Sequence, residues 1–204
     1  HIMNDTETFG VAPTHFTSRI RTINDYLINP LNGMGKGPAE NKLNYFYGMD
    51  ADDFDTEEKA RKTLEKYSPS AYGISVSPFC EIIGYDLGLH DESIVNDGPQ
   101  LIKVNNETKD YIDRKQKSNS IYTVGMGTAL KSKLLMILAF DKEKSGAIER
   151  LLKEDIDVNV PITLLRKHPN AFLILTTDIV KKIGIEKYAI TGLSPEEAAK
   201  CILR

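Results

Sequence analysis

The sequence feature that most constrains the fold is one continuous apolar run, Leu134-Leu-Met-Ile-Leu-Ala-Phe140. A half-exposed strand would alternate apolar and polar residues. This run does not alternate, so it predicts a parallel strand that is covered on both faces. A short extended segment and a glycine turn, Gly125-Met-Gly-Thr128, precede it. The functional question is therefore what this turn and the end of the strand hold in place.

Strand-like and helix-like segments alternate along the chain. The predicted strands are residues 41–47, 71–77, 134–140 and 170–176, with a further short one at 101–104. The predicted helices are residues 14–28 or 17–28, 55–67, 107–116, 141–154, 161–168 and 194–203. This alternation predicts a single α/β domain with a mainly parallel sheet and helices on both faces. We expect the domain to cover residues 4–204, and residues 1–3 to be a cloning remnant.

Composition excludes several classes of protein. The 204 residues are 41% apolar and 27% charged, and the net charge is −3 with both signs mixed along the chain. We therefore expect neither a nucleic-acid nor a membrane partner, and no apolar run approaches the ~18 residues of a membrane span. Two distant cysteines, Cys80 and Cys201, predict a reducing, cytoplasmic compartment. The histidines lack ligand spacing, so we expect no metal site and no cofactor.

Two local patterns have structural explanations. The glycine-rich stretch Asn32–Pro38 contains a lysine, but it lacks the spacing of a phosphate-binding loop, so we expect it to end the first helix together with Pro30. The acidic run Asp50–Asp55 lacks the glycine and distal glutamate of a calcium loop. It is better explained as negative charge at the start of a helix.

Several motifs in order resemble the glucosamine-6-phosphate deaminases. They are Gly37-Pro-Ala-Glu-Asn41, Thr123-Val-Gly-Met-Gly-Thr128 with the apolar strand, Lys144, Ile162-Thr-Leu-Leu165 and His168-Pro169. Together they cover about Thr14 to Asp178. The wider group includes 6-phosphogluconolactonases and ribose-5-phosphate isomerases. The resemblance implies a Rossmann-like sheet and a sugar phosphate as the ligand.

The resemblance also implies a cationic clamp for the phosphate. The family's arginine corresponds to Arg114 and its lysine to Lys144. Lys144 is predicted to lie at a helix N-terminus, where free N–H groups favour an anion. The alternative is that both residues are solvated surface charges.

The family's catalytic side chains are replaced in this sequence. The catalytic aspartate, histidine and glutamate correspond to Cys80, Ile82 and Leu87, and glycines of the motif correspond to Ser75 or Ser77. Isoleucine cannot transfer a proton. Cys80 could act as a nucleophile, but a buried and inert thiol is the alternative that the sequence favours.

A shifted alignment offers a relocated acid–base set, which is Asp86, His90 and Glu92. The alternative is that these are solvated loop residues. The family also has further residues, with its first strand and phosphate loop, before the point where this sequence begins. A sheet without that strand has an open edge. We therefore expect a rearranged amino end or a partner chain to cover it, and we expect a homo-oligomer.

Three functions are compatible with these residues. The first is a divergent deaminase or isomerase, the second a module that binds a sugar phosphate without turnover, and the third a structural domain without a ligand. The sequence predicts a glucosamine-6-phosphate deaminase-like protein that binds a phosphorylated amino sugar and has weak or no deaminase activity. The alternative is a non-catalytic module for sugar-phosphate sensing or subunit interaction.

Overall fold

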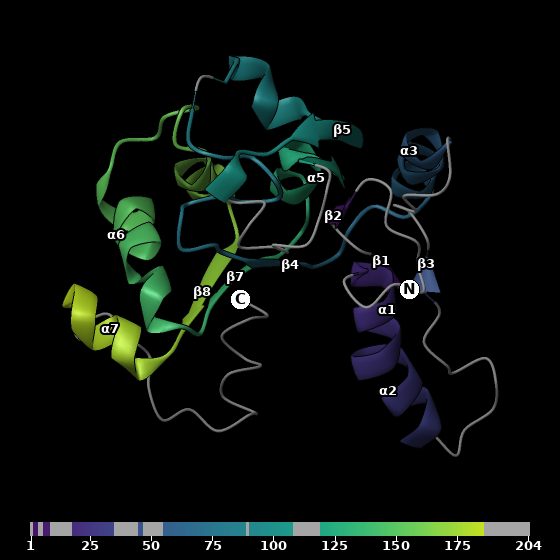
Figure 1. The fold of residues 1–204 in the computed structure, drawn as a ribbon, viewed down its shortest axis with the longest axis horizontal. Helices are drawn as coiled ribbons and strands as arrows, with labels where there is room; N and C mark the ends of the chain where they lie inside the picture. Colours follow the sequence, from purple (N-terminus) through teal and green to yellow (C-terminus); the bar gives the residue numbers. More distant parts are fainter. Residues whose placement is uncertain are drawn as a thin grey trace.

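The central feature of the computed structural model is a parallel sheet of three strands (Figure 1). The structure describes residues 2–3, 6–8, 18–34, 45–46, 55–88, 90–107 and 119–185. The sheet contains β4 (Tyr72–Ser75), β7 (Leu135–Ala139) and β8 (Ala171–Leu175), in the order β4-β7-β8. Three predicted strands are therefore confirmed, and their parallel arrangement confirms the predicted α/β fold.

The middle strand, β7, sets the register of its two neighbours. Ile137 is opposite Ile74 of β4 and Leu173 of β8. Alternate residues of β7 are buried, and Met136 and Leu138 between them are half-buried. Both faces of the strand are thus covered, as the apolar run predicts.

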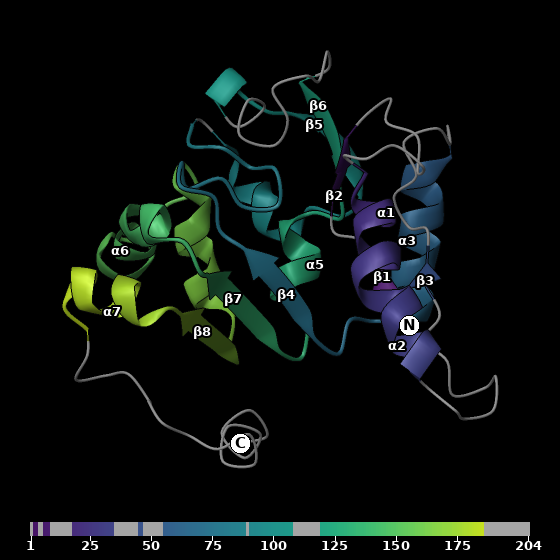
Figure 2. The ribbon, with the colours of Figure 1, turned by 60° about the horizontal axis from the view of Figure 1, so that its bottom comes forward.

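Helical segments supply that cover. Figures 1 and 2 show α6 (Ser145–Lys153) and α7 (Thr177–Ile183) on one side of the three strands and α5 (Met126–Leu130) on the other. A 3-10 helix, η5 (Pro161–Lys167), buries its first five residues and packs against α6. α3 (Thr56–Lys66) confirms the helix expected at 55–67 and buries Ala60 in the core.

Smaller sheets accompany the parallel one. β2 (Thr6–Thr8), β6 (Ser120–Thr123) and β5 (Gln100–Lys103) form an antiparallel sheet in the order β2-β6-β5. The strand expected at 101–104 is therefore confirmed, but it pairs antiparallel with β6. β1 (Ile2–Met3) pairs in parallel with β3 (Tyr45–Phe46), which is the described part of the strand expected at 41–47.

The prediction that Pro30 ends the first helix is wrong. α1 (Arg19–Ile23) continues into a π-helical turn, η1 (Asn24–Ile28), and then into α2 (Asn29–Met34). The N–H of Asn29 bonds to the carbonyl of Asn24, five residues back. The hydrogen-bond ladder has therefore already shifted by one residue where Pro30, which has no N–H, joins the helix.

Two other helical segments differ from expectation. α7 lies where no element was predicted, although Gly184 ends it in the left-handed conformation typical of a helix C-terminus. A 3-10 helix, η3 (Glu92–Asn96), also lies outside the predicted helices, and it begins where the Asp91 side chain accepts the N–H of Ser93. Most of the helix expected at 107–116, and all of that expected at 194–203, lie outside the described residues.

In the glycine turn before β7, the backbone of Gly125 and Gly127 lies close against the backbone of Asn96 and Asp97. Gly125 has φ +86°, and a Cβ there would lie 2.3 Å from the carbonyl oxygen of Asp97. A Cβ at Gly127 would lie 2.7 Å from the carbonyl carbon of Asn96, and the Gly127 N–H donates to Asp97 at 3.0 Å. Only glycine fits at these two positions, so the turn fastens α5 to the end of η3.

Replacing Gly125 with alanine should destabilise the protein. The new Cβ would meet fixed backbone atoms and hold a left-handed conformation, so we expect the free energy of unfolding to fall by about 2–4 kcal/mol. Gly146→Ala is the matched control, because that helical glycine has nothing within 4 Å of its Cβ position. It should raise stability by about 0.5–1 kcal/mol. Urea unfolding measures both, and equal effects would contradict this account.

Candidate functional site

The candidate site lies at the carboxyl end of β4, where the chain enters residues 76–88, here called the β4 loop. Contacts with other elements hold this loop. The Thr123 hydroxyl donates to the Ile83 carbonyl at 2.8 Å. The Tyr85 hydroxyl donates to the Asp97 carboxylate and accepts from the Gln100 amide, both at 3.0 Å. Burial and the nearby Asp97 charge raise the Tyr85 pKa well above its usual value, so this hydroxyl stays a donor.

Lys144 places a buried positive charge at this end of the sheet. It ends a 3-10 turn, η4 (Lys142–Lys144), which leads directly into α6. Its side chain is only 8% exposed. The Nζ atom donates to the Ser75 hydroxyl at 3.1 Å and lies 3.5 Å from the Asp141 carboxylate. Of the two alternatives that the sequence left open for Lys144, the solvated surface charge does not fit this burial.

The residue after Lys144 also carries an unusual polar atom. Ser145 begins α6 and is 1% exposed, yet its hydroxyl has no hydrogen-bond partner among the described residues. A buried hydroxyl without a partner costs free energy. The positive end of the α6 dipole lies at the same place. Cationic and polar groups thus gather where β4 ends and α6 begins.

The resemblance aligns three positions, Cys80, Ile82 and Leu87, with catalytic residues, and two of them have no titratable side chain. Ile82 is fully buried in the hydrophobic core. Leu87 is 40% exposed. Cys80 is buried with φ +66°, and its Sγ lies 3.9 Å from Nη1 of Arg150. Burial raises the pKa of the Cys80 thiol, and the Arg150 hydrogen bond offsets only part of that rise. The thiol therefore stays protonated at neutral pH.

The relocated set is not joined into a relay. The Asp86 carboxylate accepts the backbone N–H of Asn105 at 2.5 Å. His90 Nε2 lies 2.7 Å from the Asp86 backbone carbonyl, not from its carboxylate, and the imidazole packs edge-on against Tyr85. These contacts orient the imidazole and hold the β4 loop in place. They do not pair a base with an acid. A catalytic role for this set stays a prediction.

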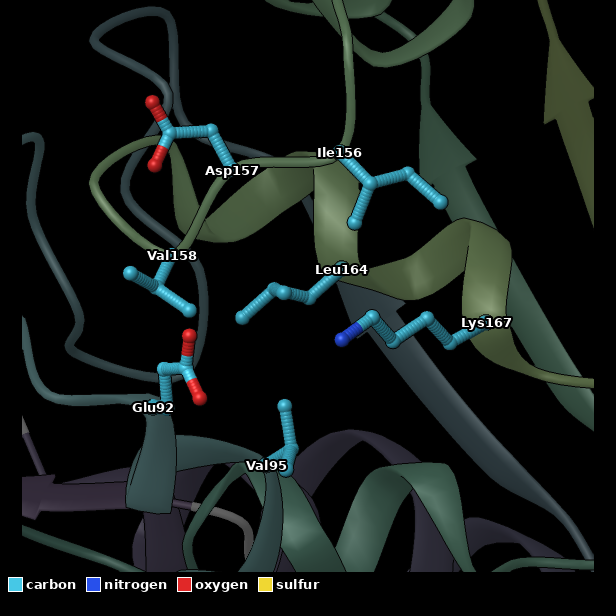
Figure 3. A pocket seen from close by; sticks show the side chains of 7 residues that line it. All are labelled: Glu92, Val95, Ile156, Asp157, Val158, Leu164 and Lys167. Carbon is cyan, nitrogen blue, oxygen red and sulfur yellow. The ribbon is translucent and has the colours of Figure 1, made fainter.

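Glu92, the third member of that set, lines a pocket of about 340 Å³ between η3, η5 and the segment after α6 (Figure 3). Figure 3 shows Glu92 and Lys167 extending toward the buried Leu164 from opposite sides, while the Asp157 carboxylate points away. Asp157 accepts the backbone and amide N–H groups of Asn159, which explains its direction. The pocket therefore places Glu92 among four apolar side chains and two charged ones, Asp157 and Lys167, and His90 does not line it.

The sequence indicates Lys144 as a candidate site residue, but it does not indicate that Ser75 and Asp141 contact the Lys144 ammonium. A signal for Asp141 existed, because residues three apart in a helical turn face each other. Ser75 had no such signal, since 69 residues separate it from Lys144 along the chain. Arg114, the second predicted clamp residue, lies outside the described residues.

The described residues contain neither a candidate metal site nor a candidate membrane-spanning helix. No group of three or more histidine, cysteine, aspartate or glutamate side chains there is placed to hold a metal ion. In the same part of the chain, no helix has the length and apolarity needed to cross a membrane.

Measurements of the free energy of unfolding can test whether the buried Ser145 hydroxyl lacks a hydrogen-bond partner. Ser145→Ala removes a buried polar atom that makes no bond, so the free energy of unfolding should stay the same or rise by about 0.5–1 kcal/mol. Ser132→Ala is the matched comparison, because that buried hydroxyl donates to the Ala129 carbonyl at 2.8 Å. It should lose about 1–2 kcal/mol. A larger loss at Ser145 than at Ser132, in urea unfolding, would contradict this assignment.

No protein-family model matches the sequence. Over 60 residues it is 40% identical to a glucosamine-6-phosphate deaminase of Staphylococcus aureus (strain JH9). That stretch is 29% of this chain and spans about a quarter (24%) of the relative's length.

Solved structures match over most of the chain. A monomeric glucosamine-6-phosphate deaminase superposes with a TM-score of 0.70 and 16% identity, covering 88% of this chain and 73% of the other. The 6-phosphogluconolactonase of Trypanosoma brucei superposes with a TM-score of 0.62 and 12% identity, with the same coverage of both chains. The chain therefore has the fold that these glucosamine-6-phosphate deaminases and 6-phosphogluconolactonases share, which confirms the resemblance indicated by its motifs.

Proposed function

We propose that the protein binds a phosphorylated amino sugar, with the phosphate at Lys144, and that it has weak or no glucosamine-6-phosphate deaminase activity. The observation that carries the proposal is the buried Lys144 ammonium at the carboxyl end of β4. Ligands of open α/β sheets bind outside the carboxyl ends of the strands. The shared fold and the 40% identical stretch support a sugar phosphate as the ligand class.

The burial of Lys144 supports an anion as the ligand. Removing an ammonium from water is costly unless nearby groups compensate. The described partners of Lys144 are a neutral hydroxyl and one carboxylate that is itself 70% exposed. These compensate the charge only in part. A phosphate bound over Ser75 would complete the compensation, and it would anchor the sugar at its far end from the reacting carbons.

Weak or absent turnover follows from the side chains of the β4 loop. Deamination needs a base near C2 of the sugar and an acid–base group for ring opening. Ile82 and Leu87 have no titratable group, and the Cys80 thiol is buried with a raised pKa. The same facts support the alternative function, which is a non-catalytic module that senses a sugar phosphate or serves a partner subunit.

Ligand binding and turnover can be measured separately. Glucosamine 6-phosphate should bind in isothermal titration calorimetry and raise the melting temperature, and Lys144→Met should abolish both effects. Lys142→Met is the matched control, because Lys142 lies in the same turn and is exposed. It should retain binding. Fructose 6-phosphate and 6-phosphogluconate, titrated in parallel, identify the preferred sugar.

An assay of ammonia release decides the second half of the proposal. We expect release close to the uncatalysed rate at saturating glucosamine 6-phosphate. Rapid release would show that the protein is an active deaminase. Failure of every sugar phosphate to bind would overturn the binding function itself.

We also propose that the protein is a cytoplasmic homo-oligomer. Within the described residues, β4 pairs only with β7, so its other edge has no strand neighbour there. Proteins usually cover such an edge. Size-exclusion chromatography with light scattering should give a mass at least twice the 22.8 kDa of one chain. A monomer at micromolar concentration would contradict this part of the proposal.

A further inference from the structure

The Lys144 ammonium already has two partners within the chain. Its Nζ lies 3.1 Å from the Ser75 hydroxyl and 3.5 Å from Oδ2 of Asp141. The two partners differ in kind, since one is neutral and the other carries a full negative charge. The exposed Asp141 carboxylate offsets part of the Lys144 charge before any ligand arrives. The free site is therefore less positive than the buried ammonium alone would make it.

Asp141 competes with any anion for the same ammonium. A phosphate monoester carries nearly two negative charges at neutral pH. Placed against Lys144, it would also lie close to the Asp141 carboxylate and be repelled by it. The anion must therefore share the ammonium with Asp141 or displace it.

The structure allows Asp141 to move aside. Its side chain is 70% exposed and makes no capping hydrogen bond to the turn that follows it. The link between Asp141 and the turn is its backbone carbonyl, which accepts the Lys144 N–H at 2.9 Å. The carboxylate can therefore rotate into water without breaking that backbone bond.

Ser75 should favour an anion at Lys144, whereas Asp141 opposes it. Because its oxygen accepts the Lys144 hydrogen bond, the hydroxyl hydrogen is directed elsewhere. Ser75 is exposed, whereas Lys144 is buried. An anion that reaches the Lys144 ammonium from solvent therefore also comes within reach of the Ser75 hydroxyl, which can donate to it.

We propose that Asp141 and Ser75 set the anion affinity of the Lys144 site, with Asp141 as a built-in competitor and Ser75 as a direct ligand of a phosphate monoester. The inference rests on the proposed function, since it concerns the same site. It goes further by assigning opposite effects to two residues that touch one ammonium. The free protein holds Asp141 on Lys144, and the bound protein holds the phosphate there.

The test is a titration of the 204-residue chain with glucosamine 6-phosphate by calorimetry at low ionic strength. Asp141→Asn removes the charge and keeps the shape, so it should bind about three- to fivefold more tightly than the unmodified protein. Ser75→Ala should bind several-fold more weakly. Glu143→Gln is the matched control, because Glu143 lies in the same turn and is exposed. It should change the affinity little.

Each outcome decides between the two proposals. Unchanged or weaker binding by Asp141→Asn overturns the competitor role, and the binding function survives if Lys144→Met still abolishes binding. Equal gains in Asp141→Asn and Glu143→Gln also overturn it, because the effect would then be one of general charge. Tighter or unchanged binding by Ser75→Ala overturns the ligand role of Ser75. If neither the unmodified protein nor Asp141→Asn binds, both the proposed function and this inference are wrong.

Discussion

The pairing of β7 on both of its edges is the interaction on which the rest of the structure depends. β7 is hydrogen-bonded in parallel to β4 and to β8, so all three strands end at the same edge of the sheet. Ser75 is the last residue of β4, and Asp141 and Lys144 follow the end of β7. The Ser75 hydroxyl therefore meets a carboxylate and an ammonium that come from a distant segment of the chain. The candidate site is a direct consequence of strand register.

The central strand, β7, could be predicted because burial on both faces leaves a mark in the sequence. A strand covered on both faces needs an uninterrupted apolar run, and the one at 134–140 is unmistakable. The resemblance to the deaminases singled out Lys144, and the helix expected after that strand placed it at a helix N-terminus. The burial of Lys144 could not be predicted, because it depends on how β4 and β7 are aligned. The π-helical turn before Pro30 was also beyond reach, since it is a shift in the hydrogen-bond ladder that no residue type specifies.

Ligand recognition and proton transfer have different physical requirements in this region. A buried lysine can hold an anion through charge alone, whereas a catalytic acid needs a titratable side chain whose surroundings tune its pKa. Ile82 occupies a fully buried position, where an apolar side chain of its size contributes roughly 1.5–3 kcal/mol to stability. An ionised group at that position would have to be desolvated at considerable cost. The interior of the β4 loop is therefore built for packing, and the polar chemistry lies at its edge.

The backbone of the β4 loop has a consequence for how this region can change during evolution. Cys80 and Ile83 both have positive φ angles, +66° and +54°, which are unfavourable for residues with a Cβ. Their own side chains do not favour this path. Hydrogen bonds impose it, both inside the loop, where the Ser77 hydroxyl accepts the N–H groups of Phe79 and Glu81, and from other elements, through Thr123 on Ile83 and Asp97 on Tyr85. Because these bonds do not use the side chains of Ile82 and Leu87, those two side chains can be exchanged while the path of the loop persists. A loop of this kind can lose one chemistry, or acquire another, without a new fold.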